Sequence, residues 1–175
     1  MKTDKLMTRD VRTCRPDDRL TEPARIMWEN DCGCVPVVDA QLRVLGMITD
    51  RDICMAAYTQ GRRLEDIHVQ IVMSKSVHCC RSDDDVSAAE ELMRTQKLHR
   101  LPVVDDSRRL VGLLSLNDLA CRAAIEQGQK DKQVSLEEVG RTLAAVCAHG
   151  PSTLGKAVVQ PAKRPVLASG SRVSP

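Results

Sequence analysis

The chain contains two copies of one segment, displaced by 66 residues. Residues 6–57 align with residues 72–123 without a gap. The matches include Met7 with Met73, Val11 with Val77, Cys14 with Cys80, Met27 with Met93, residues 36–39 (Pro-Val-Val-Asp) with 102–105, Gly46 with Gly112, and Asp52 with Asp118. Such a duplication predicts two similar units that pack on each other, because neither alone can cover its apolar surface.

Hydrophobic periodicity predicts the same order of elements in each copy: strand, helix, strand, strand, helix. In the first copy these are a short strand over residues 11–14, a helix capped by Asp17 or Asp18 that ends between Asn30 and Gly33, strands over 35–38 and 43–48, and a helix over 50–58 that stops near Gly61. The expected fold class is therefore α+β, with two tandem β-α-β-β-α repeats related by an approximate two-fold axis. Surfaces near such an axis commonly pair, so a homodimer is expected.

The expected domain division is a first repeat at 5–61, a linker at 62–71, a second repeat at 72–126, a C-terminal helix at 133–148 and a flexible tail at 149–175. The predicted helix begins with a capping box of Ser135 and Glu138, and one apolar stripe follows, formed by Leu136, Val139, Leu143 and Val146. The tail is rich in proline, glycine and serine and has no acidic residue.

Charge and aromatic content argue against several classes of partner. The formal net charge is only +2, and Trp28 and Tyr58 are the only aromatic residues, so a nucleic-acid surface is not expected. The first residues do not resemble a secretory signal, and there is no apolar run long enough to span a bilayer. A cytoplasmic protein without a membrane association is expected.

The eight cysteines are expected to be reduced thiols rather than a disulfide framework. Cys32 and Cys34 form a C-x-C pair and Cys79 and Cys80 are adjacent, but there is no C-x-x-C pair and the histidines stand apart. Structural zinc sites usually draw on wider, paired ligand spacings, so no metal site is predicted.

Pro-Val-Val-Asp is followed by Gly-Met-Ile-Thr-Asp-Arg-Asp-Ile at 46–53, and the counterpart in the second copy is Leu-Val-Gly-Leu-Leu-Ser-Leu-Asn-Asp-Leu at 110–119. This order of motifs resembles the cystathionine-β-synthase-type (CBS) repeat. The resemblance covers about residues 5–124. It implies a stand-alone regulatory module that binds AMP, ADP, ATP or another adenosyl effector, such as S-adenosylmethionine or an NAD-type ligand, and acts on an unidentified protein. No cofactor is required and no catalytic residue is implied.

The resemblance also implies that Asp52 and Asp118 accept hydrogen bonds from ribose hydroxyls, with Thr49 and Ser115 beside them. A carboxylate offers two acceptor oxygens that match a vicinal diol. The Thr-x-x-Asp and Ser-x-x-Asp spacings also fit a helix capping box, which would explain both pairs without any ligand. Both roles can coexist.

Residues 97–102 (Lys-Leu-His-Arg-Leu-Pro) resemble the phosphate-contacting segment of nucleotide-sensing CBS proteins. His99 and Arg100 are the expected phosphate ligands, and Arg51 is expected to add a positive charge. A solvated basic pair at a helix end is the alternative. The first repeat has Gly33 and Cys34 instead, so the two clefts should differ in affinity. Candidates for the adenine pocket are Val11, Thr13, Val35, Pro36, Val77, Cys79, Leu101 and Pro102.

Two other functions stay open. The duplicated fold could serve only as a ligand-free dimerisation or interaction module, in which case nucleotides would cause no thermal shift. A thiol or metal sensor would use Cys32, Cys34, Cys79 and Cys80. The sequence contains no glycine-rich phosphate loop, nucleophile elbow or His-Glu metal motif, so an enzyme is not expected.

Overall fold

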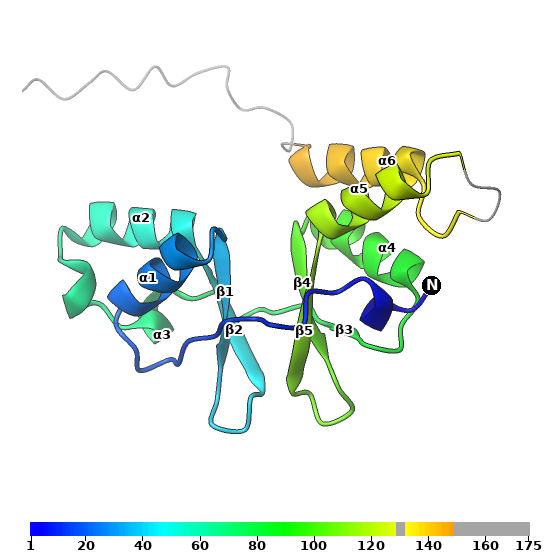
Figure 1. The fold of residues 1–175 in the computed structure, drawn as a ribbon. Coiled ribbons are helices and arrows are strands. Elements are labelled where there is room, and N and C mark those ends of the chain that lie inside the picture. The colour runs from blue at the N-terminus through cyan, green and yellow to red at the C-terminus, as the bar shows by residue number, and fades with distance from the viewer. Residues whose placement is uncertain (129–131, 149–175) are drawn as a thin grey trace, which may run out of the picture.

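The computed structural model describes residues 1–128 and 132–148, so the expected flexible tail lies outside the described residues. Two halves stand side by side with their hairpins facing each other and their helices outside (Figure 1). The first half contains α1 (Thr21–Glu29), β1 (Cys34–Val38), β2 (Val44–Thr49), α2 (Asp50–Gln60) and α3 (Val69–Val72). The second contains β3 (Cys80–Arg81), α4 (Val86–Gln96), β4 (Arg100–Val104), β5 (Leu110–Ser115), α5 (Leu116–Ile125) and α6 (Leu136–Cys147). Short 3-10 helices lie at Thr3–Lys5 and Leu64–Asp66.

The two sheets repeat one pattern of pairing. β1 and β2 are antiparallel, as are β4 and β5, and each hairpin has an irregularity at the equivalent place, between Val37 and Val38 and between Val103 and Val104. β3 adds a parallel strand to the second hairpin. In the first half the predicted strand over 11–14 is reduced to one parallel bridge, between Cys14 and Val37.

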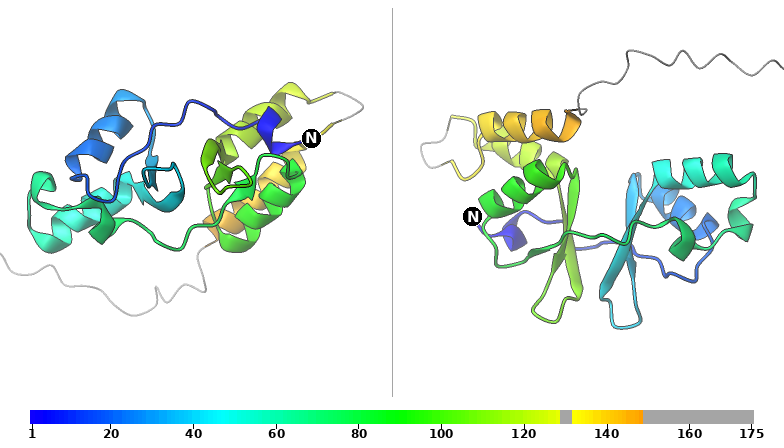
Figure 2. Two further views of the ribbon diagram at one scale, coloured as in Figure 1. Left: turned by 90° about the horizontal axis from the view of Figure 1, so that it is seen from below. Right: turned by 180° about the vertical axis from the view of Figure 1, so that it is seen from behind.

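The leading segment of each repeat packs on the sheet of the other repeat. Thr8 forms a bridge with Leu113 in the second half, and Ser74 forms a bridge with Met47 in the first. These connections are the dark blue and green segments that cross between the halves in both views of Figure 2. The halves are therefore interlocked, and each cleft between them is bounded by a crossing segment.

Each half has its own apolar core between its sheet and its helices. Leu20, Ile48 and Ile67 are fully buried in the first core, and Met93, Leu101, Leu114 and Leu119 in the second. Burying a side chain of this size stabilises the fold by roughly 1.5–3 kcal/mol. Two aromatic side chains stay outside these cores, since Trp28 on α1 is 89% exposed and Tyr58 on α2 is 81% exposed.

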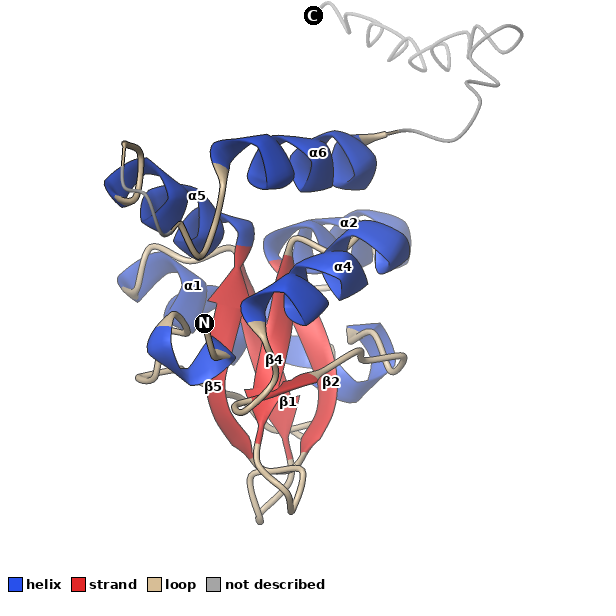
Figure 3. Ribbon diagram, turned by 90° about the vertical axis from the view of Figure 1, so that its right-hand side faces the viewer, coloured by secondary structure: helices blue, strands red, loops and turns tan. Residues whose placement is uncertain are grey.

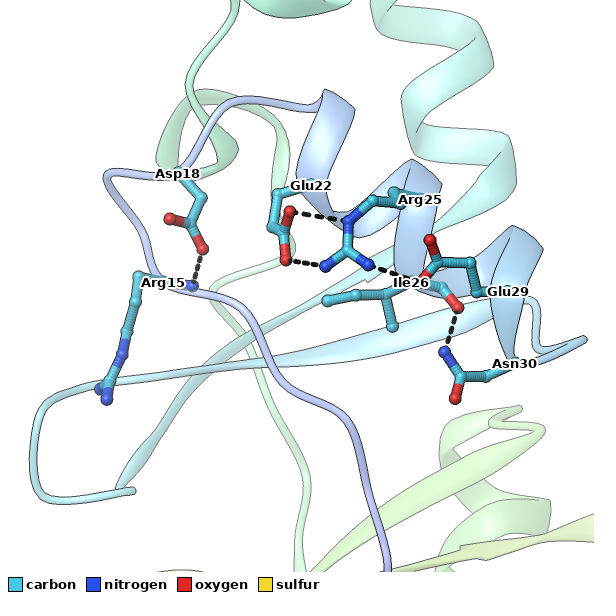
Figure 4. A network of polar contacts seen from close by, with 7 residues as sticks. All are labelled: Arg15, Asp18, Glu22, Arg25, Ile26, Glu29 and Asn30. Carbon is cyan, nitrogen blue, oxygen red and sulfur yellow. Dashed lines mark hydrogen bonds and ion pairs between the residues drawn. The ribbon is translucent and has the colours of Figure 1, made fainter.

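The start of α1 differs from the prediction. Neither Asp17 nor Asp18 caps it: the residue before the helix is Leu20, and no side chain caps the first turn. The Asp18 carboxylate instead accepts the Arg15 N–H at 2.6 Å, as Figure 4 shows. The predicted end is correct, because α1 finishes at Glu29 and the Asn30 side chain donates to the Ile26 carbonyl at 2.8 Å.

α6 packs on α4 and α5 of the second half (Figures 1 and 3). Its first turn is capped by Ser135, whose hydroxyl accepts the Glu138 N–H at 3.1 Å. Val139, Thr142 and Val146 are buried against the second half, whereas Leu136 and Leu143 are about half exposed. The predicted apolar stripe is therefore split between a buried side and an exposed side.

Candidate ligand-binding clefts

Two cavities contain most of the predicted site residues. The first cleft, of about 250 Å³, is lined by Cys34, Met47, Thr49, Asp52, Ser74, Ser76, Val77, His78, Lys97, Leu98, His99, Arg100 and Pro102. The second cleft, of about 410 Å³, is lined by Thr8, Asp10, Val11, Arg12, Asn30, Asp31, Cys32, Gly33, Cys34, Arg100, Leu113, Ser115, Asn117 and Asp118. Most of the two linings are equivalent under the 66-residue offset, so these are two versions of one site.

Asp52 and Thr49 form the capping box that begins α2. Asp52 Oδ2 accepts the Thr49 N–H at 2.9 Å and the Thr49 hydroxyl at 2.7 Å, and the Thr49 hydroxyl in turn accepts the Asp52 N–H at 3.1 Å. The capping interpretation is thus correct. Within the described residues, every hydrogen bond to this carboxylate goes to Oδ2, so Oδ1 keeps its acceptor capacity for another group on the cleft wall.

Asp118 and Ser115 repeat this arrangement at the start of α5 in the second cleft. Asp118 Oδ2 accepts the Ser115 N–H at 2.7 Å and the Ser115 hydroxyl at 2.6 Å. Both carboxylates are half-buried and lie at the N-terminal end of a helix of ten or eleven residues. Each cleft therefore has a fixed acceptor beside the positive end of a helix dipole.

The predicted phosphate residues fall in different places. His99 and Arg100 line the first cleft together with Asp52, joined by Lys97 and His78. Arg100 is exposed, and among the described residues no ion pair or side-chain hydrogen bond involves it. Arg51 lies outside both clefts, in a shallow depression with Asp50 and Cys54. The structure thus brings two of the three predicted residues into one cleft with the ribose candidate.

The predicted adenine residues are divided in the same way. Val77 and Pro102 line the first cleft and Val11 lines the second. Thr13, Val35, Pro36, Cys79 and Leu101 line neither cleft. Val35 and Leu101 are fully buried in the two cores, because alternate residues of a strand face opposite sides of the sheet.

Several lining residues were missed from the sequence. Ser74, Ser76, His78 and Lys97 belong to the first cleft, and Asp10, Arg12, Asn30 and Asp31 to the second. The 66-residue offset could have found them, because it relates lining residues of one cleft to lining residues of the other. It relates Asp10 to Ser76, Arg12 to His78 and Asp31 to Lys97. What the offset does not say is that the leading segments cross to the opposite sheet.

Burial disfavours the thiolate form of most of the candidate sensor thiols. It raises the pKa of Cys14 and of Cys80 to about 12, and it raises the pKa of Cys34 and of Cys79 as well. Since the thiolate is the reactive and metal-binding form, Cys34, Cys79 and Cys80 give no support to a thiol sensor. Among residues 1–128 and 132–148, no group of three or more histidine, cysteine or acidic side chains is placed to hold a metal ion.

No helix in the described part of the chain combines the length and apolar character needed to cross a membrane.

Comparison with known proteins matches each of the two repeats. The family model for the CBS domain matches residues 4–58 and again residues 65–123. The inosine-5'-monophosphate dehydrogenase of Methanocaldococcus jannaschii is 34% identical over 91% of this chain, which spans only 30% of that protein. The CBS domain-containing protein YhcV of Bacillus subtilis is 36% identical over 65% of this chain and 79% of its own length.

Solved structures have the same fold. The conserved CBS domain protein TA0289 of Thermoplasma acidophilum matches with a TM-score of 0.68 and 23% identity, over 83% of this chain and 75% of that one. The CBS domain pair of MJ0100, in complex with 5'-methylthioadenosine and S-adenosyl-L-methionine, has a TM-score of 0.62 and 24% identity. The match covers 69% of this chain and 98% of that one. CBSX2 in complex with AMP has a TM-score of 0.62 and 22% identity, over 73% of this chain and 98% of that one. With two matched repeats and this α+β architecture, the chain belongs to the CBS-domain family.

Proposed function

We propose that this chain is a regulatory module that binds an adenine nucleotide in the first cleft. The observation that carries the proposal is that Asp52, His99 and Arg100 line one cavity although they come from different repeats. The open Oδ1 of Asp52 can accept hydrogen bonds from ribose hydroxyls, and the Arg100 guanidinium suits phosphate oxygens. The MJ0100 complex with two adenosyl compounds and the CBSX2 complex with AMP support this ligand class.

Such a ligand would connect the two halves of the molecule. Its ribose would be held by the start of α2 in the first half, and its phosphate by Lys97, His99 and Arg100, which follow α4 in the second half. A ligand that prefers one relative placement of the halves shifts the population toward it. The output then passes to another protein or through a homodimer, in the cytoplasm, without catalysis by this module.

The test compares Asp52→Asn with Asp118→Asn by calorimetric titration with AMP. Both changes weaken equivalent capping boxes, so both should lower the melting temperature similarly, as expected for caps worth about 0.5–2 kcal/mol. Only Asp52→Asn should weaken AMP binding, by tenfold or more. Unchanged AMP affinity in Asp52→Asn, or no binding of any adenine nucleotide to the unmodified protein, would contradict the proposal.

A second candidate is a dimerisation module, favoured by one exposed surface. Trp28 lies almost fully exposed beside a hollow of about 350 Å³ that is lined by Ala24, Met27, Trp28, Cys32, Asp50, Ile53 and Cys54. Aromatic residues are enriched at protein interfaces, and the helices that α6 packs on, α4 and α5, belong to the other half. Trp28→Ser should convert a dimer to a monomer in sedimentation velocity, whereas Tyr58→Ser, a second exposed aromatic outside the hollow, is the matched control.

A further inference from the structure

We propose that the second cleft selects adenosyl compounds that carry no phosphate and are uncharged or positively charged at the 5′ position. This inference rests on the proposed function of the first cleft, because it uses the internal symmetry of the molecule. The sequence predicts clefts that differ in affinity, and this inference adds that they differ in the ligand they select.

The second cleft keeps the features that suit an adenosyl group. Ser115 and Asp118 reproduce the geometry of Thr49 and Asp52. Within the described residues, the hydrogen bonds to the Asp118 carboxylate all go to Oδ2. Val11 lines the second cleft where Val77 lines the first. The volume is larger, about 410 Å³ against about 250 Å³. The acceptor for a sugar hydroxyl and the valine on the wall are therefore equivalent in both clefts, whereas Pro102 has no counterpart in the second.

The phosphate end differs at each equivalent position. Lys97 and Asp31 both follow a helix with a left-handed backbone, at φ values of 54° and 47°, so the same turn presents opposite charges. Gly33 replaces His99 and Cys34 replaces Arg100, which removes two donors. Asp10 replaces Ser76 and adds a carboxylate to the wall.

The net charge of the lining residues therefore has opposite sign in the two clefts. The first cleft has Lys97 and Arg100 against the single carboxylate of Asp52, with His78 and His99 as further donors. The second cleft has three carboxylates, those of Asp10, Asp31 and Asp118, against Arg12 and Arg100.

Neither arginine gives the second cleft a positive charge that is both unpaired and its own. Arg12 lies 3.6 Å from Asp10, which offsets its charge locally. Arg100 is shared with the first cleft, so it is not a positive charge of the second cleft alone. A phosphate dianion would face net negative charge here, which disfavours it, whereas a thioether or sulfonium at the 5′ position would not be repelled.

The experiment isolates the second cleft by using Asp52→Asn as the background. Calorimetry with 5'-methylthioadenosine, an uncharged probe, should show one site per chain in this variant, and AMP should bind it at least tenfold more weakly than the uncharged probe. Adding Asp118→Asn should abolish the remaining site. Adding Asp31→Lys instead, which restores the charge found at Lys97, should strengthen AMP binding at least tenfold. Asp17→Lys, which changes an exposed aspartate outside both clefts, should not.

The outcomes separate this inference from the proposed function. If Asp52→Asn weakens AMP binding to the first cleft but the variant then binds AMP as tightly as 5'-methylthioadenosine, or binds neither, the selectivity of the second cleft is overturned while the proposed function stands. If Asp52→Asn leaves AMP binding unchanged, the proposed function itself is wrong. An Asp31→Lys variant with unaltered AMP affinity would also overturn the assignment of charge as the cause.

Discussion

Cys34 and Arg100 occupy equivalent positions in the two repeats, and each of them lines both clefts. They begin β1 and β4, opposite Thr49 and Ser115 respectively. Burial raises the pKa of the Cys34 thiol, and the positive charge of Arg100 partly offsets this effect. One guanidinium therefore stands where the two clefts approach each other.

Arg100→Ala is expected to weaken AMP binding in the first cleft by about tenfold to a hundredfold, the effect of losing a charge-assisted bond of about 1.5–3 kcal/mol. Arg51→Ala removes the same charge from the neighbouring helix but outside both clefts, so its effect should be less than threefold. Calorimetric titration with AMP at two salt concentrations checks both. Equal losses in the two variants would show that general positive charge, rather than the position of Arg100, holds the phosphate.

Much of the fold could be predicted because it is encoded in short stretches of sequence. The 66-residue repeat predicted two similar halves, and the Thr49 and Ser115 capping boxes predicted where α2 and α5 begin. Gly61 ends α2 with a φ of 61°, as expected for a glycine just beyond a helix. The capping boxes and Gly61 depend on residues a few positions apart, and the repeat is visible from the sequence alone, which is why these features could be predicted.

Features set by long-range packing were not predictable in this way. The repeat aligned Met7 with Met73 and Gly46 with Gly112. It did not indicate that Met73 packs on Gly46 and Met7 on Gly112, and these are the contacts that lock the halves together. The same crossing brings Ser74 and Ser76 into the first cleft. Arg51 was misplaced for a related reason: being next to Asp52 in sequence does not determine which side of α2 it occupies.

The glycines under the crossing segments should not tolerate a side chain. A Cβ on Gly112 would lie 2.4 Å from Met7 Sδ and 2.9 Å from the Thr8 carbonyl oxygen, and one on Gly46 would lie 2.7 Å from Met73 Sδ and 2.8 Å from the Ser74 carbonyl oxygen. Each Gly→Ala change is expected to destabilise the fold by about 1–3 kcal/mol in denaturant unfolding. Gly140→Ala is the control, because that Cβ meets nothing within 4 Å and alanine favours the helix. A Gly112→Ala protein as stable as Gly140→Ala would show that the crossing segment is not held in place.

Glu126 anchors the segment that leads into α6, so the stability of the fold should depend on pH in the acid range. Its Oε2 accepts the N–H groups of Gln133 at 2.6 Å and Val134 at 3.0 Å, and its Oε1 accepts Arg122 Nε at 2.6 Å. The bond from the Val134 N–H, with those from Gln133 and Arg122, lowers the pKa of this carboxyl in the folded state. The stabilisation is therefore present above the unfolded value near 4.5 and lost as the pH falls through the lower folded value.

Glu126→Gln should lower the melting temperature at pH 7 and reduce the further loss of stability between pH 5 and pH 3. Glu137→Gln, on the exposed face of α6, should change little, because exposed ion pairs contribute about 0–1 kcal/mol. Thermal unfolding followed by circular dichroism across this pH range measures both. A Glu126→Gln protein with the acid profile of the unmodified chain would contradict the anchoring role.

Glu90 should have the opposite effect on the dependence of stability on pH. It is 5% exposed between α4 and α6, where its Oε1 accepts the Thr142 hydroxyl at 3.0 Å. Burial raises its pKa, with a smaller contribution from Glu138, while the Thr142 bond and Arg94 act in the other direction. Because the folded pKa lies above the unfolded value near 4.5, protonation favours the fold: that stability is present below 4.5 and lost as the pH rises through the folded value.

Glu90→Gln keeps an acceptor for Thr142 but removes the buried charge, so it should raise the melting temperature by about 2–4 °C at pH 7, the shift that corresponds to about 1 kcal/mol in a chain of this size. The gain should vanish near pH 4, where Glu90 is already protonated. Glu91→Gln is the matched control on α4, since its exposed side chain pairs with Arg94 and its loss should not stabilise the fold. Thermal unfolding at both pH values decides the matter, and a Glu90→Gln protein that is less stable than the unmodified chain at pH 7 would mean that the ionised carboxylate holds α6 in place.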